Sequence, residues 1–499
     1  MPEDRNAKYE GVGYMLPEYE ERLPQWGLID DATAGPSQVK EKAELYLPWP
    51  VPEAIDSSKE NAARYDTYLF RAVFYGVSKR TLGGYVGQVF TTDPIFSYPE
   101  TDEALGNLSA DVDGAGITLD QQAQKAVAEV VSKGRSALFV DFPTTAGERP
   151  TLKEEAENGL RPVIVRYAAE QVINWRSKAV GSENRLSLVM IVEQHAEDDD
   201  GYEEATVERW KELRLTEENV YLVRHHRWDE EKGEFYQDGE DVIPTDANGE
   251  PFGYIPFTFI GSTNNDSVPD QPPMGDLCDL NMAHYRNSAD NEEMLFIMGQ
   301  PTPYVSGLSE DWAKEIMGEN IQLGSRKLLV LPEGGNAGVI EISANADVLG
   351  KEMARKEDQM VKLGAKLVES GGVQRTATDA VIQEASESSV LASAANNVSS
   401  AYTTALGYIQ AFRGIEFDPG ELYYELSSDF DIHRLTPQGQ QQMVANWMSG
   451  AITDSELRDQ FLKAGIATED FDTWKTVQDT NALNTGLGSG AGVEDKPEE

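Results

Sequence analysis

The 499-residue chain has a single cysteine, Cys278, and this scarcity limits its chemistry. Without a second thiol the chain can form neither an internal disulfide nor a zinc site built from several cysteines. A near absence of cysteine is typical of proteins that function in a reducing compartment, so we expect an intracellular origin.

Basic residues are also few, with 42 Lys and Arg against 87 Asp and Glu, and the formal net charge is −45. This balance argues against binding of a polyanion through a broad basic patch. A strongly acidic surface could instead repel nucleic acid, so that it slides past without sticking, or it could reflect a saline habitat.

Long apolar runs are missing. No stretch approaches the ~18 apolar residues that cross a membrane, and the first six residues carry neither a basic nor an apolar segment of a secretory leader. We therefore expect no signal peptide and no membrane contact. Hydrophobic residues make up 40% of the chain, which supports a folded protein of two to four structural units.

Catalytic and cofactor motifs are absent as well. No GxxxxGK[ST] phosphate loop occurs, and the glycines at 486–492 have no strand before them and no helix after them. The acidic run at 197–201 lacks the ligand spacing of a calcium loop. Paired carboxylates are frequent in so acidic a chain and carry no information. We predict no catalytic residue, no metal site and no cofactor.

Histidine and cysteine give no reactive pair either. His225 and His226 are adjacent in an expected strand, so they should point to opposite faces and not share a metal. Cys278 and His284 are six residues apart on an expected helix and should lie on different faces, which favours a packed cysteine over a nucleophile.

The periodicity that is present predicts an α+β fold. Residues 1–55 show no sustained period and are expected to wrap over other elements. Helices are predicted at 57–89 with a break at Gly83 and Gly84, at 119–133 closed by Gly134, at 276–298, and in short pieces at 437–447, 455–464 and 469–480. Strands are predicted at 136–142, 163–167, 186–193, 206–215, 220–228, 235–237 and 422–426, with a hairpin turn at Asn248 and Gly249 and an open sheet or small barrel in the β-rich part.

Two long helices form the most informative pattern. Residues 345–369 are rich in Lys, Glu, Ala, Met and Leu, and ~25 helical residues span roughly 37 Å. Gly371 and Gly372 then free the backbone, and a second helix of about 35 residues, rich in Ala and Ser, is predicted from Thr378. Arg375 in this elbow either caps carbonyls or pairs with a subunit's carboxylate, or else faces a passing polyanion.

A small α/β insert precedes this helix pair. A short helix is predicted at 310–317 and strands at 327–331 and 339–342, with the turn between them at Gly334, Gly335 and Asn336. Because the insert lies between the helices 276–298 and 345–369, it should be a lobe held on two helical legs.

In this order the elements resemble those of a tailed-bacteriophage portal protein, and more narrowly a group of phage and prophage portal-like proteins catalogued as a domain of unknown function. The resemblance covers about residues 45–430. The stretches that carry it are LPW at 47–49, YDTYLFRAVF at 65–74, TLGGYVG at 81–87, GRSALFVD at 134–141, YIPFTFIG at 254–261 and PMGDLCDLN at 273–281.

The resemblance implies a division into portal domains. These are a mixed α/β wing at 1–272, a first stem helix at 273–299, a clip at 300–344, a second stem helix at 345–369, a tunnel loop at 370–378, a wing helix and strand at 379–435, short crown-like helices at 436–480 and a disordered acidic tail at 481–499.

It also implies roles for particular residues. The tunnel loop that narrows a DNA channel would carry Gly371, Gly372, Val373, Gln374, Arg375 and Thr376. The clip that docks an adaptor or terminase would present Trp312, Lys314, Arg326, Lys327, Glu333 and Asn336. The stem wall of the channel would carry Lys351, Arg355, Lys356 and Lys362.

A portal would be a homo-oligomer, typically a dodecamer, at one capsid vertex of the virion, assembled in the host cytoplasm. Its expected partners are the major capsid protein, the head-tail adaptor, the large terminase and, transiently and without specificity, double-stranded DNA. Two alternatives stay open: another structural phage component of the tail or baseplate, and a hydrolase fused to a helical scaffold.

Overall fold

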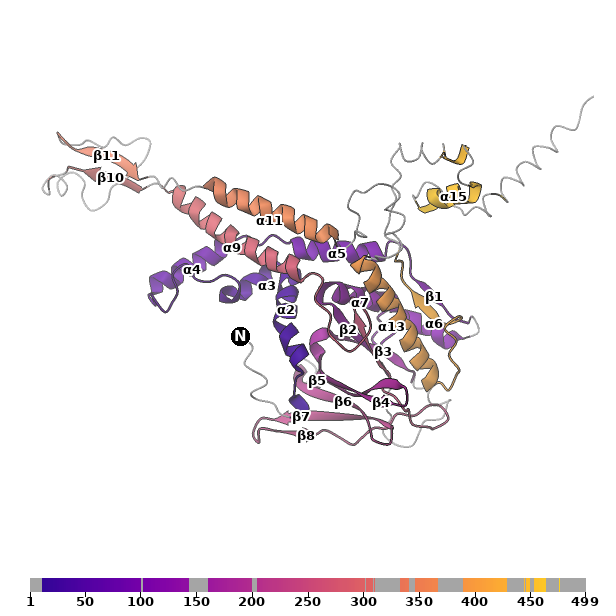
Figure 1. Ribbon diagram of the computed structural model, residues 1–499. Coiled ribbons are helices and arrows are strands. Elements are labelled where there is room, and N and C mark those ends of the chain that lie inside the picture. The colour runs from indigo at the N-terminus through magenta and orange to yellow at the C-terminus, as the bar shows by residue number, and fades with distance from the viewer. Residues whose placement is uncertain are drawn as a thin grey trace, which may run out of the picture. The chain divides into compact units, whose positions relative to one another are not determined.

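The computed structural model describes residues 11–99, 102–142, 160–199, 204–300, 302–307, 309, 333–340, 346–366, 389–428, 444, 446–448, 453–463 and 475. The chain divides into two units, Met1–Ser428 and Asp429–Glu499. The first unit contains runs of helices and of antiparallel strands (Figure 1), which confirms the predicted α+β class.

The described helices are distributed over both units. In the first unit they are η1 (Gly11–Gly13), α2 (Pro17–Ala34), α3 (Pro36–Glu41), η2 (Ala43–Leu45), α4 (Lys59–Arg71), α5 (Val77–Val89), α6 (Glu103–Ala110), α7 (Leu119–Lys133), η3 (Ala169–Gln171), α9 (Gly275–Met298), α11 (Ala346–Lys366) and α13 (Val390–Phe412). In the second unit the described residues include α15 (Asp454–Lys463).

The described strands form four antiparallel sheets. Their order is β3-β2-β9 in one sheet, β4-β5-β6-β7-β8 in the largest, and β1-β12 and β10-β11 in the two pairs. The strands are β1 (Ile95–Ser97), β2 (Arg135–Asp141), β3 (Val163–Ala168), β4 (Val172–Val180), β5 (Glu183–Asp199), β6 (Glu204–Leu215), β7 (Tyr221–Asp229), β8 (Glu234–Gln237), β9 (Phe257–Gly261), β10 (Thr302–Ser306), β11 (Asn336–Ile340) and β12 (Tyr423–Glu425).

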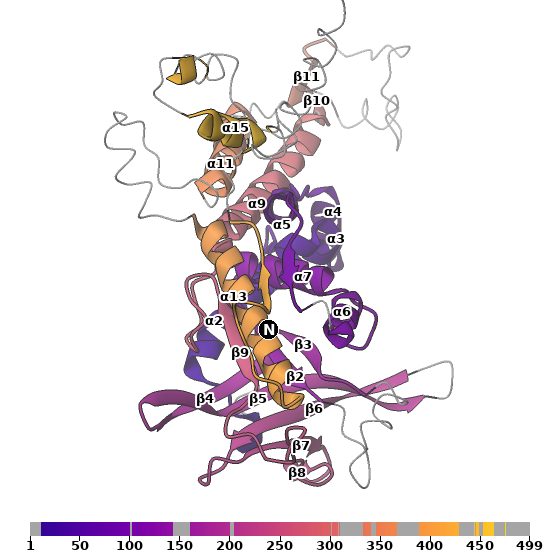
Figure 2. The same cartoon turned by 90° about the vertical axis from the view of Figure 1, so that its right-hand side faces the viewer.

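The core of the first unit is built around β2. Six of its seven residues are buried, because β3 and β9 flank it and the helices α7 and α13 pack on it (Figure 2). The alanines and serines of α13 let this helix lie close to the sheet. A buried hydrogen bond of 3.1 Å from the Tyr402 hydroxyl to Gln122 Oε1 joins α13 to α7.

The five-stranded sheet is attached to this core through a buried charged group. Lys211 Nζ on β6 lies 2.8 Å from Glu193 Oε1 and 3.1 Å from the Tyr167 hydroxyl on β3. The same ammonium lies 5.6 Å from the ring centre of Phe139 on β2. Because burial raises the pKa of Tyr167, its hydroxyl stays protonated and donates to Glu193.

The local signals around α7 were sufficient to predict it. Thr118 and Gln121 form a capping box at its start, and Gly134 ends it with a φ of 78°. The strands predicted at 136–142, 163–167, 186–193, 206–215, 220–228, 235–237 and 422–426 fall on β2, β3, β5, β6, β7, β8 and β12. The large sheet is open, with β4 and β8 at its edges, and β4 was not predicted.

Residues 1–55, expected to wrap over other elements without a sustained period, contain a long helix that the sequence did not predict. α2 is an 18-residue helix whose buried Trp26 donates a 3.0 Å hydrogen bond to the Lys133 carbonyl oxygen. The Lys133 ammonium in turn lies 2.8 Å from Asp30 and 2.6 Å from Glu170. Pro24 inside the helix and its many charges hide the apolar stripe, so contacts with α7 and η3 maintain a helix that the sequence alone obscures.

The predicted break at Gly83 and Gly84 was also wrong, since α5 continues through both residues. The chain instead leaves the helix at Ala72, where ψ is 133°. The Val73 N–H then donates a 3.0 Å hydrogen bond to Ser288 Oγ on α9, a partner 215 positions away. This long-range contact places the break in a position that the local sequence does not show.

Candidate functional site: the α9–α11 helix pair and its hairpin

A clamped loop leads the chain from β9 into α9. Asn265 Nδ2 donates to the Asn397 carbonyl oxygen at 2.9 Å, and Asn397 Nδ2 donates back to the Gly261 carbonyl oxygen at 2.8 Å. The helix α9 then begins at Gly275, with Met274 as its N-cap residue. The two bonds fix the end of β9 and the loop before α9 against α13.

α9 agrees with the helix predicted at 276–298, and one side of it is buried against the body of the first unit. The Tyr68 hydroxyl of α4 donates a 2.6 Å hydrogen bond to Asp290, and Arg71 lies 2.6 Å from Glu293. Asn281 donates to Ser78 of α5 at 3.0 Å. α4 and α5 thus support α9 over much of its roughly 36 Å.

α11 returns antiparallel to α9 and packs along it (Figure 1). The Lys356 ammonium donates to the Ala283 carbonyl oxygen of α9 at 3.2 Å. Next to it, His284 Nε2 lies 3.2 Å from Glu357 Oε1. Met360 on α11 is buried. The described helix begins at Ala346 and covers most of the range 345–369 predicted from sequence.

The four cations predicted for a stem wall separate into two groups. Lys351, Arg355 and Lys362 are exposed and lie within about 40° of one another around α11 at ~100° per residue. Lys356 lies about 100° or more from these three residues and packs against α9, and burial lowers its pKa.

Two of the exposed cations are paired within the helix. Arg355 makes a bidentate contact of 2.9 and 2.6 Å with Glu352, and the hydrogen bond lowers the pKa of that carboxyl. Lys362 lies 2.6 Å from Asp358. The exposed side of α11 therefore combines positive and negative charge and would hold an anionic polymer only weakly.

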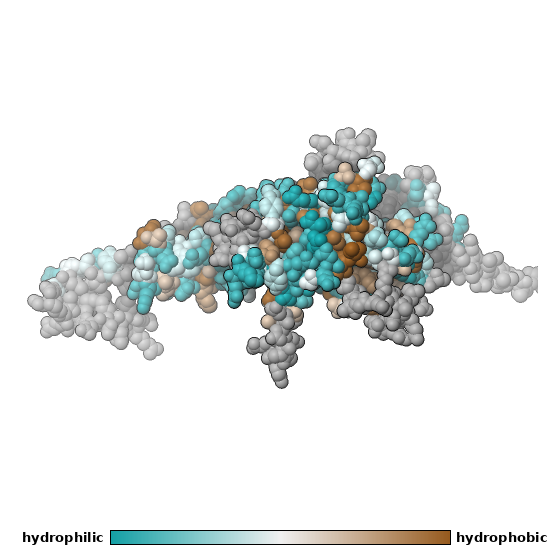
Figure 3. Space-filling view, turned by 90° about the horizontal axis from the view of Figure 1, so that it is seen from below, coloured by the Kyte–Doolittle hydropathy of each residue, from teal (hydrophilic) through white to brown (hydrophobic). Residues whose placement is uncertain are grey.

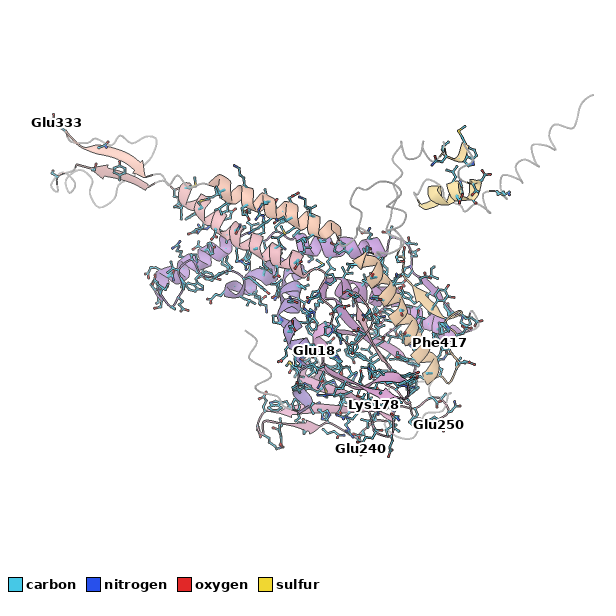
Figure 4. The ribbon with its side chains drawn as sticks, in the orientation of Figure 1. Glu18, Lys178, Glu240, Glu250, Glu333 and Phe417 are labelled. Atoms are coloured by element: carbon cyan, nitrogen blue, oxygen red, sulfur yellow. The ribbon has the colours of Figure 1, made fainter. Side chains whose placement is uncertain are left out.

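The lobe between the helices contains a two-stranded hairpin. β10 pairs with β11 from Thr302 opposite Ile340 to Ser306 opposite Asn336. β10 was not predicted, and Asn336, expected in the turn, is the first residue of β11. Gly338 lacks a side chain where a Cβ would lie 2.8 Å from the Tyr304 ring. Glu333 and Asn336 are exposed at the end of the hairpin opposite to its helical connections (Figure 4).

Several predicted positions lie outside the described residues. These are the clip residues Trp312, Lys314, Arg326 and Lys327, the clip helix 310–317, the strand 327–331 and the whole tunnel loop with Gly371, Gly372, Val373, Gln374, Arg375 and Thr376. The second helix, predicted from Thr378, is described from Val390 with its cap at Ser389. Phe417 beyond it packs against Gly407, where a Cβ would meet the ring at 3.2 Å (Figure 4).

Within the described ranges, no three His, Cys, Asp or Glu side chains come together in a way that could hold a metal ion. Burial raises the pKa of Cys278 to about 12, so the thiol is not a nucleophile at neutral pH. Burial also lowers the pKa of His225 to about 4, while His226 lies 2.7 Å from Glu212. The adjacent histidines therefore have different neighbours.

Two features of this region were missed from sequence. One is the pair His284 and Glu357, because helix contacts across 73 positions leave no local signal. The other is the exposed segment between α4 and α5, because the break was predicted eleven residues later. The spacing of Tyr65 and Tyr68, both buried, did show the inner side of α4.

Among the described helices none is long and apolar enough to cross a membrane. Figure 3 shows one face of the molecule, on which hydrophilic residues surround separate hydrophobic areas.

The chain is thus an α+β protein in which the packed helices α9 and α11 are connected through the β10–β11 hairpin. A family model described as a domain of unknown function, DUF4055, matches residues 273–413, which include α9, the hairpin, α11 and α13. A search of curated proteins finds no match. The matched residues thus include both helices of the pair, and the description of the family assigns no activity.

Solved structures similar to this chain include chains from gene transfer agent particles. A chain from the virion of the native particle has 11% identity and a TM-score of 0.38, covering 84% of this chain and 95% of that one. One from the neck of the native particle computed with C12 symmetry has 13% identity and a TM-score of 0.38, covering 81% and 94%. One from the neck of the empty particle computed with C6 symmetry has 12% identity and a TM-score of 0.39, covering 84% and 95%.

Proposed function

We propose that this chain is a portal-type subunit of a phage or phage-like particle, which forms a ring around a channel for DNA at one capsid vertex. The observation that carries the proposal is the antiparallel pair of α9 and α11 with a hairpin between them, joined to an α/β body. In this arrangement α9 and α11 are the stem, and the hairpin is part of the clip.

The electrostatics of the helix pair suit a conduit. Twelve copies would carry a formal charge of about −540, twelve times −45, so the ring as a whole repels the phosphate backbone. The cations at Arg355 and Lys362 are already paired with Glu352 and Asp358. A wall of such pairs borders the DNA without gripping it, so the motor meets little resistance.

The remaining roles follow from position. The exposed Glu333 and Asn336 on the hairpin would contact the head-tail adaptor or the large terminase. The elbow 370–378, with Arg375, would narrow the channel and shift as DNA passes. The body of the first unit would contact the major capsid protein, and rings would assemble in the host cytoplasm before entering the virion.

The test is the size and symmetry of the purified full chain. Native mass measurement should give an assembly near twelve copies, roughly 660 kDa from chains of 55.1 kDa, and particle images should show a ring with a central hole. A monomer at micromolar concentration would defeat the proposal. A ring with a metal-dependent nuclease or protease activity would favour an enzyme instead.

A further inference from the structure

Two sheets meet at a cluster of one amine and two carboxyl groups. Phe139 and Asp141 of β2 share the side of the three-stranded sheet on which Tyr167 of β3 lies, because side chains alternate along a strand. Glu193 on β5 and Lys211 on β6 are diagonal neighbours on one side of the five-stranded sheet. The strands β2, β5 and β6 thus bring Asp141, Glu193 and Lys211 together.

The Lys211 amine reaches both carboxyl groups. Its Nζ atom lies 2.8 Å from Glu193 Oε1 and 3.9 Å from Asp141 Oδ2. The ring centres of Phe139 and Tyr167 lie 5.6 and 5.9 Å from the same nitrogen, and only 10% of the Lys211 side chain is exposed. Groups held this close and kept from water react as if highly concentrated, because their encounter costs little entropy. A small movement of the lysine side chain brings the amine to the Asp141 carboxyl carbon.

The two carboxyl groups differ in how readily they take a proton. Loss of hydration raises the pKa of the Asp141 carboxyl, and the negative charge of Glu193 raises it further. Burial also acts to raise the pKa of Glu193, but Lys211 and the Tyr167 hydroxyl outweigh it and hold that pKa below its ordinary value. Neighbouring carboxyls whose pKa values are moved apart supply an acid and a base, here Asp141 and Glu193.

The two oxygens of Asp141 have different neighbours. Oδ1 accepts a 2.9 Å hydrogen bond from the Phe142 N–H, whereas Oδ2 is the oxygen that faces Lys211. A donor on Oδ1 stabilises the negative charge that develops there when a nucleophile attacks the carboxyl carbon. Oδ2 is then the leaving oxygen, and the 38% exposure of the Asp141 side chain gives a released water a way out.

We propose that Lys211 and Asp141 condense to a covalent amide, which ties the five-stranded sheet to β2. One proton passes from the Lys211 ammonium to Asp141 Oδ2, and the neutral Nζ attacks Cγ. Glu193 takes a second proton from Nζ and gives it to Oδ2, the Cγ–Oδ2 bond breaks, and one water leaves. The new bond joins parts of one chain, so the inference is independent of the proposed ring.

The product suits the site better than the reactants do. An ammonium and a carboxylate with little access to water become a neutral amide, so the cost of keeping two charges there disappears. Glu193 keeps its charge and retains the Tyr167 hydroxyl as a hydrogen-bond donor, with the Arg209 cation nearby. The condensation consumes no oxidant, reductant or second substrate, so folding alone can bring it about.

A second buried lysine of this chain provides an internal control. Lys133 Nζ lies 2.8 Å from Asp30, 2.6 Å from Glu170 and 3.5 Å from Glu129. Burial acts to lower the pKa of Lys133, but the three carboxylates outweigh it and raise that pKa. The Lys133 nitrogen therefore keeps its proton and has no lone pair with which to attack, although carboxyl groups surround it.

Mass spectrometry of the purified full chain tests the bond. After overnight incubation of the folded protein, we expect an intact mass below that of the sequence by one water, about 18 Da. Trypsin does not cut after an acylated lysine, so the peptide 136–153 should stay joined to the peptide 210–214 through Lys211. Cleavage after Lys133 should be complete.

Single-site variants separate the reacting groups from the proton carrier. Lys211→Met and Asp141→Ala each lack one partner and should have the masses of their own sequences. Glu193→Gln keeps both partners but carries no proton between them, so the linked fraction should fall at least tenfold. Glu170→Gln, beside Lys133, is the matched control and should leave Lys211 linked as in wild type.

Three outcomes count against the bond. A wild-type chain of unaltered mass that trypsin cuts after Lys211 would overturn the proposal. A loss of water confined to the peptide 136–153 would do the same, because it marks a cyclic imide formed by Asp141 with its own backbone. If Glu193→Gln is linked to the same extent as wild type, Glu193 is not the proton carrier and the proposed reaction is wrong.

Discussion

The hydroxyl of Tyr85 on α5 donates a 2.6 Å hydrogen bond to the carbonyl oxygen of Gly364 on α11. Burial raises the pKa of Tyr85, so the hydroxyl remains a donor at any pH at which the protein is used. A Cβ at position 364 would lie 3.4 Å from both Tyr85 and Thr81. Tyr85 and Gly364 therefore join α11 to the body of the first unit.

Replacing Tyr85 by Phe removes this bond and leaves a buried carbonyl oxygen without its donor. We expect the free energy of unfolding to fall by about 1–3 kcal/mol, measured from urea denaturation. Tyr236→Phe is the control, since Tyr236 is 45% exposed and should change the stability by less than about 0.5 kcal/mol. Equal effects of the two variants would show that the bond to Gly364 adds nothing.

Gly134 is expected to tolerate no side chain. Its φ is 78°, and a Cβ would lie 2.8 Å from the Gln271 carbonyl oxygen in the loop that leads to α9. Gly134→Ala should therefore cost more than the roughly 1–2 kcal/mol of left-handed strain. Gly233, with φ of 67° and open space around it, separates the two effects, because Gly233→Ala pays for strain alone. If both variants have the same melting temperature, the contact with Gln271 is harmless.

α7 and β2 could be predicted because their signals are local. The capping box at Thr118, the terminating glycine and the unbroken apolar strand all lie within 24 residues. The helix α2 and the break after α4 could not be predicted, because Trp26 is held by Lys133 and Val73 by Ser288, both far away in sequence. Where a residue distant in sequence fixes the backbone conformation, periodicity alone predicts the end of a helix at the wrong residue.

The candidate site was predictable in its order but not in its contacts. Helix, insert and helix follow from composition, whereas the antiparallel packing depends on His284, Lys356 and Glu357 meeting across the pair. Lys351, Arg355 and Lys362, named from the resemblance, lie on one exposed side of α11. The sequence could not show that Lys356 turns to α9, since a lysine suits both exposed and half-buried positions.

Asp102 should make stability depend on pH in the acidic range. Its carboxylate lies 2.6 and 2.9 Å from the Arg413 guanidinium. Burial acts to raise the pKa of Asp102, but Arg413 and the Leu105 N–H outweigh it and hold the pKa below its ordinary value of 3.8. A lowered pKa means that this stabilisation is complete above the unfolded value and is lost as the pH falls through the folded one.

Asp102→Asn should therefore be less stable than wild type by about 1 kcal/mol at neutral pH, with a difference that shrinks below about pH 4. Denaturation midpoints measured from pH 7 to pH 2 give this comparison. The same substitution in an Arg413→Met background should show no such trend, because the cation is gone. A pH-independent difference in both backgrounds would mean that the pair carries no charge effect.

The elbow at 370–378 lies outside the described residues, and its role is open to a direct genetic test. The sequence predicts a pliable backbone at Gly371 and Gly372, because glycine restricts φ least, whereas proline at both positions would fix φ near −65° and remove two N–H donors. If the elbow moves as DNA passes, Gly371→Pro with Gly372→Pro should leave rings intact but reduce packaged and retained DNA at least tenfold. Proline at Gly488 and Gly490, in the tail, is the matched control and should package normally. Rings of normal size that package and retain DNA like wild type would show that a rigid elbow suffices, and the channel would then have to be narrowed by α11 itself.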